Sequence, residues 1–385
     1  EENSGKRIFN LSRSGYAGMQ QYNMIPWSGD VQRTFSGLKA QIPIMLGMTM
    51  TGIPYMHSDL GGFTGSLSDE LYLRWMQFGV FTPVMRAHGV GDPPEPIYYN
   101  EQTKNIVREF MMLRHCLLPY NYDLAAENAQ AGLPLTRPMF FYDESENASD
   151  FLDEQYFWGE NLLIAPVCEE GQEQKQIWLP NGNWIYFFDD RTSFQGGRTI
   201  EISTPDDEYP VFIKAGSIIP MVPPFLTYKD YDTDTLIIHY YPDETIAESF
   251  YDIYNDDGVE VFEDLNQGEN ISFQALRQDN NISIQISKTG LYNQDYQRLI
   301  EYILHRVDSP GTVSYADTIL QITTDGSVYD QSVNLALYDE TNNLLKIKTS
   351  WTAQDAEILI SEIDLTDDIP SNLQRGQAFI SEVFP

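Results

Sequence analysis

The hydrophobic pattern changes near residue 133, and this change constrains the fold more than any other feature of the sequence. Before it, short apolar runs alternate with segments whose apolar residues recur at helical spacing, as in residues 31–45 and 71–78. After it, short alternating runs such as "QIWLP", "NWIYFF" and "NISIQIS" follow one another with turn residues between them. The sequence therefore predicts an α/β part followed by an all-β part.

The first part reads as strand–helix units in succession, which implies parallel strands. Each expected strand ends in a residue able to take part in chemistry: Arg13, Asp30, Asp59 and His88. In a barrel of alternating strands and helices, the carboxyl ends of the strands carry the active site. Four such units make half of a (β/α)8 TIM barrel, so we expect a half-barrel over residues 1–133 and a chain that begins within it.

Local signals place the helices of this part. Pro43 should kink or shorten the helix that follows Val31. Ser66 and Asp69 have the spacing of a capping box before the next helix. A longer helix is expected from about Glu101, with Pro119 near its end.

The second part has a sequence pattern typical of antiparallel β-sandwiches, because short strands are separated by turn residues at close spacing. Pro223-Pro224 marks a boundary within it. We therefore expect two β-sandwich domains, at residues 134–223 and 224–385.

The formal net charge is −34, and it is concentrated in the second part. Residues 1–133 hold 10 Lys and Arg against 12 Asp and Glu, whereas residues 134–385 hold 13 against 45. Such a surface repels nucleic acid and anionic membranes, and it suits neutral ligands. No run of 18 apolar residues occurs, so we expect no membrane span.

Metal chemistry finds little support in the sequence. Cys116 and Cys168 have no metal-binding or redox spacing and are expected to be buried thiols. The stretch "IYNDDGVEVFE" (253–263) has acidic residues spaced faintly like a calcium loop, but it lacks a bidentate Glu at the right distance. We therefore expect no metal site.

Asp30 and Asp59 form a pair of carboxylates at adjacent strand ends, with Arg13 and His88 at the neighbouring ends. Paired carboxylates among aromatic rings suit glycoside chemistry, in which one acid protonates the leaving oxygen. The aromatic residues near them in the sequence are Tyr22, Trp27, Tyr55, Phe63 and Trp75.

Plainer interpretations exist for several of these residues. A strand-end Asp such as Asp30 is often the N-cap of the next helix. Trp75 recurs at helical spacing and is expected in a core, and Arg74 and Arg86 are expected to form structural ion pairs. His57 could face either side of its strand.

Several long motifs, in a fixed order, resemble the C-terminal portion of glycoside hydrolase family 31, the α-glucosidase and α-xylosidase family. They are "SRSGYAGMQQYNMIPWSGD" (12–30), "GIPYMHSDLGGF" (52–63), "ELYLRWMQFGVFTPVMRAHG" (70–89), "LLIAPV" (162–167), "WLPNGNWIYFF" (178–188) and "PVFIKAGSIIP" (210–220). The resemblance covers about residues 7–260. It implies that the half-barrel is the C-terminal half and that two β-sandwich domains follow it.

The resemblance implies that Asp30, which closes "WSGD", is the general acid/base of a retaining α-glycosidase. It implies also that Trp27 lies beside the bound sugar and that Arg13 lies near Asp30. The family's nucleophile is an Asp on an earlier strand, and that segment is absent from this sequence. The missing N-terminal half of the enzyme is therefore an expected partner, and the chain alone is expected to be inactive.

Three further residues match the family's pocket. Asp59 in "DLGGF" and His88 in "RAHG" match residues that hydrogen-bond the non-reducing sugar, and Phe63 matches a wall. The implied activity is release of terminal α-linked glucose from oligosaccharides by double displacement, without a cofactor. An α-xylosidase or an α-glucosyltransferase is the alternative within the family, and a non-catalytic carbohydrate-binding fragment is the alternative of another class. The oligomeric state stays open.

Overall fold

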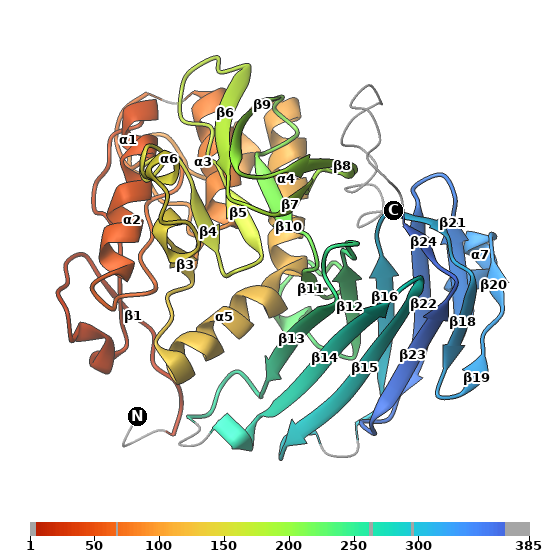
Figure 1. Cartoon of the computed structure of the whole chain (residues 1–385). Coiled ribbons are helices and arrows are strands. Elements are labelled where there is room, and N and C mark those ends of the chain that lie inside the picture. The colour runs from red at the N-terminus through yellow and green to blue at the C-terminus, as the bar shows by residue number, and fades with distance from the viewer. Residues whose placement is uncertain (1–4, 67, 262–264, 294–295, 366–385) are drawn as a thin grey trace.

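The structure is a computed structural model that describes residues 5–66, 68–261, 265–293 and 296–365 (Figure 1). Helices dominate the first 150 residues and strands dominate the rest, so the predicted change of pattern is observed. The α-helices are α1 (Phe35–Lys39), α2 (Gln41–Thr49), α3 (Asp69–Val80), α4 (Glu101–Cys116), α5 (Leu118–Ala131), α6 (Glu146–Ser149) and α7 (Gly326–Asp330). The 3₁₀ helices are η1 (Met19–Tyr22), η2 (Pro96–Tyr98), η3 (Met139–Phe141), η4 (Tyr228–Asp230) and η5 (Leu265–Gln267).

The N-terminal part is built on parallel pairings, as its strand–helix succession predicts. Strands β1 (Asn10–Ser12) and β2 (Met24–Pro26) pair in parallel. The segments that follow pair in parallel through single bridges rather than through full strands: Trp27 with His57, Gln32 with Thr64, and Leu60 with Ala87. These pairings set consecutive segment ends side by side.

The helix expected after Val31 is two helices, α1 and α2, which divide at Ala40. Thr34 is the N-cap of α1, and its hydroxyl accepts a hydrogen bond from the Gly37 backbone N–H at 3.0 Å. Pro43 lies in the first turn of α2, where a backbone N–H has no intrahelical partner in any case. The predicted shortening is therefore observed, with the proline near the start of the second helix.

The predicted capping box before α3 is wrong by two residues. Ser68, not Ser66, is the N-cap, and its hydroxyl accepts a hydrogen bond from the Leu71 backbone N–H. Ser68 has the extended backbone that an N-cap requires, and Asp69 then occupies the first helical turn, where a negative charge is favourable.

The long helix expected from Glu101 is also two helices. Helix α4 ends at Cys116, and Pro119 is the second residue of α5 rather than a residue near a helix end. Proline is tolerated there because its missing N–H would have had no helical partner. Helix α5 is not predicted by the sequence pattern.

The middle part is a six-stranded sheet with a small second sheet. Its strands are β3 (Thr136–Arg137), β4 (Tyr156–Trp158), β5 (Leu162–Ile164), β6 (Gln174–Leu179), β7 (Asn183–Tyr186), β8 (Asp189–Gln195), β9 (Arg198–Ser203) and β10 (Val211–Lys214). The larger sheet has the order β3-β4-β5-β10-β7-β8, and β6 pairs with β9. One buried cluster includes Trp75 of α3, Phe110 of α4 and Trp158 of β4, so helices and sheet share a core.

The last part contains two more six-stranded sheets. Its strands are β11 (Ile218–Met221), β12 (Thr235–Tyr240), β13 (Glu248–Asn255), β14 (Glu269–Gln278), β15 (Asn281–Gly290), β16 (Arg298–Leu304), β17 (Val307–Ser309), β18 (Thr312–Tyr315), β19 (Thr318–Ile319), β20 (Ile322–Thr323), β21 (Leu335–Asp339), β22 (Leu344–Trp351), β23 (Ala356–Ser361) and β24 (Asp364–Leu365). The sheets run β11-β12-β16-β22-β21-β20 and β13-β14-β15-β23-β18-β19. Ile300 and Ile347 of the first sheet and Ile284 and Ile358 of the second belong to one buried cluster. Strand β11 precedes the boundary expected near residue 223, yet it pairs with β12.

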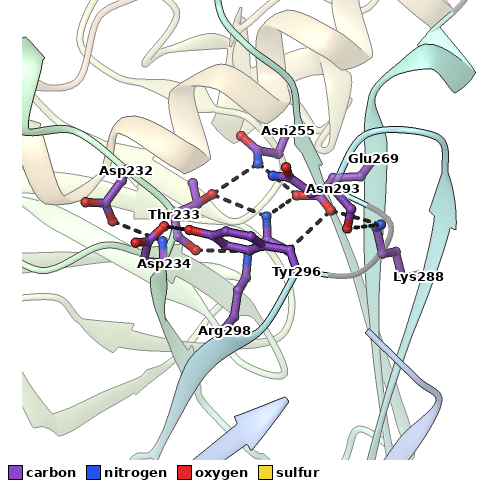
Figure 2. Close-up of polar contacts among 9 residues, drawn as sticks. All are labelled: Asp232, Thr233, Asp234, Asn255, Glu269, Lys288, Asn293, Tyr296 and Arg298. Carbon is purple, nitrogen blue, oxygen red and sulfur yellow. Dashed lines mark hydrogen bonds and ion pairs between the residues drawn. The ribbon is translucent and has the colours of Figure 1, made fainter. Parts of the chain in front are cut away.

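A buried network of charged and polar side chains joins these two sheets at one end (Figure 2). The fully buried Glu269 carboxylate pairs with Arg298, whose Nη1 lies 3.2 Å away, and with Lys288, whose Nζ lies 3.5 Å away. The Asn255 amide donates to Glu269 at 2.8 Å and to the Thr233 hydroxyl at 3.0 Å. The two cations and the amide thus compensate the cost of burying the carboxylate.

Candidate active site

Asp30 and Arg13 form an ion pair at the ends of the first two parallel strands. The Arg13 Nη2 atom lies 3.2 Å from Asp30 Oδ2, and both side chains reach solvent, with exposed fractions of 63% and 43%. Gly29 has φ +82°, and a Cβ at that position would lie 3.3 Å from the Arg13 guanidinium. Because Thr34 caps α1, the plainer interpretation of Asp30 as the helix N-cap is wrong.

Asp59 is the second carboxylate of the site, and it is fully buried. One of its oxygens, Oδ1, forms an ion pair with Arg86. The other, Oδ2, is buried without a hydrogen-bond partner in the structure. Burial raises the pKa of Asp59, and the positive charge of Arg86 opposes that shift. A buried carboxylate oxygen without a donor is costly, so this atom is poised to accept a hydrogen bond from a ligand.

Arg86 and His57 surround Asp59 and were not predicted as site residues. The Arg86 Nε atom donates to His57 Nε2 at 3.3 Å, and the guanidinium lies 5.4 Å from the centre of the Trp27 ring. Burial and the nearby Arg86 lower the pKa of His57 to about 4, so its imidazole is neutral at pH 7. Arg86 does form the expected ion pair, but within the site. His57 faces into the site, where it accepts the hydrogen bond from Arg86.

The rings of Phe63 and His88 lie together, and His88 lies near Asp59. Their ring centres are 5.5 Å apart, and the charge of His88 lowers the pKa of Asp59. The backbone of Phe63 is fixed from both sides, since its N–H donates to Val31 at 2.8 Å and its carbonyl accepts from Val90 at 2.9 Å. The structure thus holds an aromatic ring and an imidazole side by side in the candidate site.

The glycines of "DLGGF" set the position of Phe63. Gly61 and Gly62 have φ of +85° and +81°, which other residues rarely adopt. A Cβ on Gly62 would lie 2.7 Å from Arg33 Cγ. The buried Arg33 guanidinium in turn donates to the Gly62 carbonyl at 3.1 Å and to the Asp92 carbonyl at 2.9 Å. Arg33 therefore ties this loop to the segment after His88.

Two other candidates, Trp75 and Arg74, have structural roles. Trp75 is fully buried, and its indole donates to the Ser58 hydroxyl at 3.1 Å, so its assignment to the core is confirmed. Arg74 donates to the Thr204 carbonyl at 2.6 Å and pairs with Asp206, as expected for a structural arginine.

The described residues include no group of three His, Cys, Asp or Glu side chains that could hold a metal. Asp256, in the stretch with calcium-like spacing, pairs with Arg7 and accepts a hydrogen bond from Tyr122, while residues 262 and 263 lie outside the described part. Burial raises the pKa of Cys116 and of Cys168 to about 12, so both are unreactive thiols. None of the described helices is long and apolar enough to cross a bilayer.

The six predicted residues thus form two contacting pairs, Arg13 with Asp30 and Phe63 with His88, and Arg86 contacts both of the remaining two, Trp27 and Asp59. A half-exposed carboxylate can exchange protons with solvent and ligand. The buried carboxylate, the imidazole and the rings can bind hydroxyls and the apolar face of a ring.

Two family models match the chain in succession. Residues 1–124 match the glycosyl hydrolases family 31 TIM-barrel domain, and residues 132–219 match the glycosyl hydrolase family 31 C-terminal domain.

Similar proteins of known name agree with these matches. An α-xylosidase of Saccharolobus solfataricus is 32% identical over 262 residues, which are 66% of this chain and 35% of that protein. Alpha-glucosidase 2 of Bacillus thermoamyloliquefaciens is 28% identical over 349 residues, 90% of this chain and 42% of that protein. The solved structure of a Flavobacterium johnsoniae dextranase with glucose superposes with a TM-score of 0.86 at 28% identity, covering 94% of this chain and 47% of that one. The chain therefore spans less than half the length of each of these proteins.

Proposed function

The chain belongs to glycoside hydrolase family 31, and on that premise we propose that it is part of a retaining α-glycosidase. The substrate would be an oligosaccharide whose terminal, non-reducing residue is an α-linked glucose. The α-glucosidases and the α-xylosidase among its relatives support this class of reaction.

Asp30 would be the general acid/base. Its half-exposed carboxyl lies at a segment end, held by Arg13 at 3.2 Å, where it could reach both a glycosidic oxygen and solvent water. It would donate a proton to the leaving oxygen in the first step and take one from water in the second. Arg13 would orient the carboxyl between the two steps.

Asp59, His88 and Phe63 would bind the sugar on the side away from the leaving group. The observation that carries this assignment is the buried Asp59 Oδ2 atom, which has no hydrogen-bond partner. A sugar hydroxyl would donate to that oxygen, His88 would donate to a second hydroxyl, and the Phe63 ring would cover the apolar sugar face. Trp27, under the guanidinium of Arg86, would form the other wall.

Double displacement also needs a nucleophilic carboxylate about 5–5.5 Å from the acid/base. Asp59 does not suit that role, because its carboxylate is paired with Arg86 and fully buried. We assign the nucleophile to a carboxylate of the enzyme outside these site residues.

The experiment is kinetic analysis of Asp30→Asn in the intact enzyme. Cleavage of maltose should be abolished, because its leaving oxygen needs a proton, while the first step on an activated aryl α-glucoside should persist. Azide should then restore turnover by replacing base-activated water. Asp153→Asn, at an exposed carboxylate outside the site, is the matched control. Full activity of Asp30→Asn on maltose would place the acid/base elsewhere.

The same assay separates the alternatives. The α-xylosidase among the relatives makes α-xyloside hydrolysis the second candidate, and comparing aryl α-glucoside with aryl α-xyloside decides between them. An α-glucosyltransferase would release longer oligosaccharides from maltose rather than glucose alone. A non-catalytic fragment would bind sugar and cleave neither substrate.

A further inference from the structure

The outer face of the sheet β13-β14-β15-β23-β18-β19 is hollowed by a groove of about 610 Å³. Figure 1 shows β13, β14, β15 and β23 side by side, in a part of the chain distant in sequence from the candidate active site. The lining residues are Phe250, Ser272, Gln274, Gln285, Ile286, Ser287, Ser314, Ala316, Asp317, Asp355, Ala356, Glu357 and Leu359. This groove has no part in the reaction described above.

Four of these residues form one row across four strands. Phe250 pairs with Gln274, Gln274 with Gln285, and Gln285 with Glu357. Because paired residues point to the same face, the row presents an aromatic ring, two amides and a carboxylate in line. Three strand-to-strand steps span roughly 14 Å, which is the length of a few linked sugar rings.

The aromatic end of the row is strongly exposed. Phe250 has 60% of its surface accessible, although it is a large apolar side chain on a regular strand. It also lines a second hollow of about 290 Å³, between α5 and β13, together with Gln130, Asn161 and Asn270. Phe250 therefore stands between two hollows that both offer amide side chains.

The lining chemistry decides what kind of ligand fits the groove. Eight of its thirteen residues are Ser, Ala, Asp or Glu, the types depleted in protein–protein interfaces. No Lys or Arg is among these thirteen described residues, so anionic ligands are disfavoured. An amide both donates hydrogen bonds to hydroxyls and accepts them, a carboxylate accepts them, and an exposed ring packs on the apolar face of a sugar.

We propose that this groove binds a neutral, α-linked glucan chain, with its sugar rings laid across the row from Phe250 to Glu357. The choice of an α-linked glucan rests on the proposed function. The groove would hold a polymeric substrate on the enzyme while the active site works at a chain end. The effect should therefore appear with polymers and not with small glycosides.

The test is retention of the intact enzyme in native gels that contain soluble starch or dextran. The Asp30→Asn background prevents digestion of the polymer. Phe250→Ala and Gln285→Ala should each weaken retention, with about 10- to 100-fold loss of affinity for Phe250→Ala. Tyr228→Ala, at an aromatic residue that is 80% exposed on η4, is the matched control and should change nothing.

Retention that is absent, or that is unchanged in Phe250→Ala, overturns the proposal. A change of oligomeric state in Phe250→Ala, without a change in retention, would mean that the face binds protein instead, and it also overturns the proposal. Without the Asp30 substitution, Phe250→Ala should cleave an aryl α-glucoside at the normal rate. The proposed function is tested separately: if the unsubstituted enzyme cleaves no α-glycoside, the proposed function is wrong, whatever the gels show.

Discussion

Replacing Arg86 by methionine should expose how strongly the site depends on one cation. Arg86 pairs with the fully buried Asp59, donates to His57 at 3.3 Å and covers the Trp27 ring at 5.4 Å. Arg86→Met keeps an apolar stem over the indole and leaves the Asp59 carboxylate without its cation. Breaking a buried pair costs about 3–5 kcal/mol. Because a quarter of the Arg86 side chain is exposed, we expect the lower end, about 3 kcal/mol, in the free energy of unfolding.

The same substitution should change the pH dependence of catalysis. Burial already raises the pKa of Asp59, and Arg86 is the largest influence that opposes this shift. Without Arg86 the pKa of Asp59 rises further, so the acid limb of kcat/KM should move to higher pH. Weakened binding of the transition state by this carboxyl should lower kcat/KM at pH 7 by roughly 10- to 100-fold. The assay is the pH profile of aryl α-glucoside hydrolysis by the intact enzyme.

Arg74→Met is the matched control, because Arg74 is also buried and paired with a carboxylate, Asp206, but lies outside the site. It should destabilise the fold and leave the acid limb in place. Arg86→Lys should recover part of the lost activity. An unchanged acid limb in Arg86→Met would refute the electrostatic role that we assign to Arg86.

Three further predictions concern stability, measured by urea denaturation. Burial and Arg86 lower the pKa of His57 from its ordinary value of about 6.5 to about 4. The contribution of His57 to stability is therefore full above about pH 6.5 and is lost as the pH falls through 4. His57→Gln should remove this pH dependence, which is worth up to about 3 kcal/mol, and an unchanged pH slope would contradict the prediction. Glu269→Gln should lower the free energy of unfolding by about 3–5 kcal/mol, because it leaves two buried cations with a neutral partner. The control Glu248→Gln, at an exposed carboxylate, should change it by no more than about 0.5 kcal/mol. Equal effects of the two substitutions would contradict the stabilising role of the buried network. Gly62→Ala should lower the free energy of unfolding by about 1–3 kcal/mol and reduce activity, since φ is +81° and the new methyl group would clash with the buried Arg33. Wild-type stability of this variant would show that the loop can rearrange without cost.

The arrangement of the candidate site follows from the order of the segments. Parallel segments place their carboxyl ends at one edge, so residues that end consecutive strands become neighbours. This is why Asp30 meets Arg13 and why Asp59 lies near His88, although up to 29 residues separate them in sequence.

The ion pair of Arg86 was predicted but its place in the site was not, because an arginine at a strand end pairs with whichever carboxylate the fold brings near it. A usable signal was present, however. Arg86 lies two residues before His88, and His57 lies two residues before Asp59. In an extended chain, the side chains of residues two apart point to the same side. Arg86 should therefore face the site together with His88, and His57 together with Asp59.

Helix boundaries were less predictable than the site, because competing local signals have similar energies. Ser66 and Ser68 are both suitable caps, and the backbone conformation of Ser68 decides between them. Pro119 fits the start of a helix as well as a position beyond one, so the junction between α4 and α5 could not be read from the sequence. The position of β11, whose residues precede Pro223-Pro224, depends on pairing with β12 rather than on any local signal.

The most direct measurement is the crystal structure of the intact enzyme carrying Asp30→Asn with an uncleaved α-linked glucosyl disaccharide. We expect the side chain at position 30 to lie within about 3 Å of the glycosidic oxygen. Asp59 Oδ2, which has no partner in the free chain, should accept a hydrogen bond of about 2.5–3.0 Å from a hydroxyl of the non-reducing sugar. If both side chains lie more than about 4 Å from every sugar oxygen, with no bridging water, the assignment of the active site is wrong.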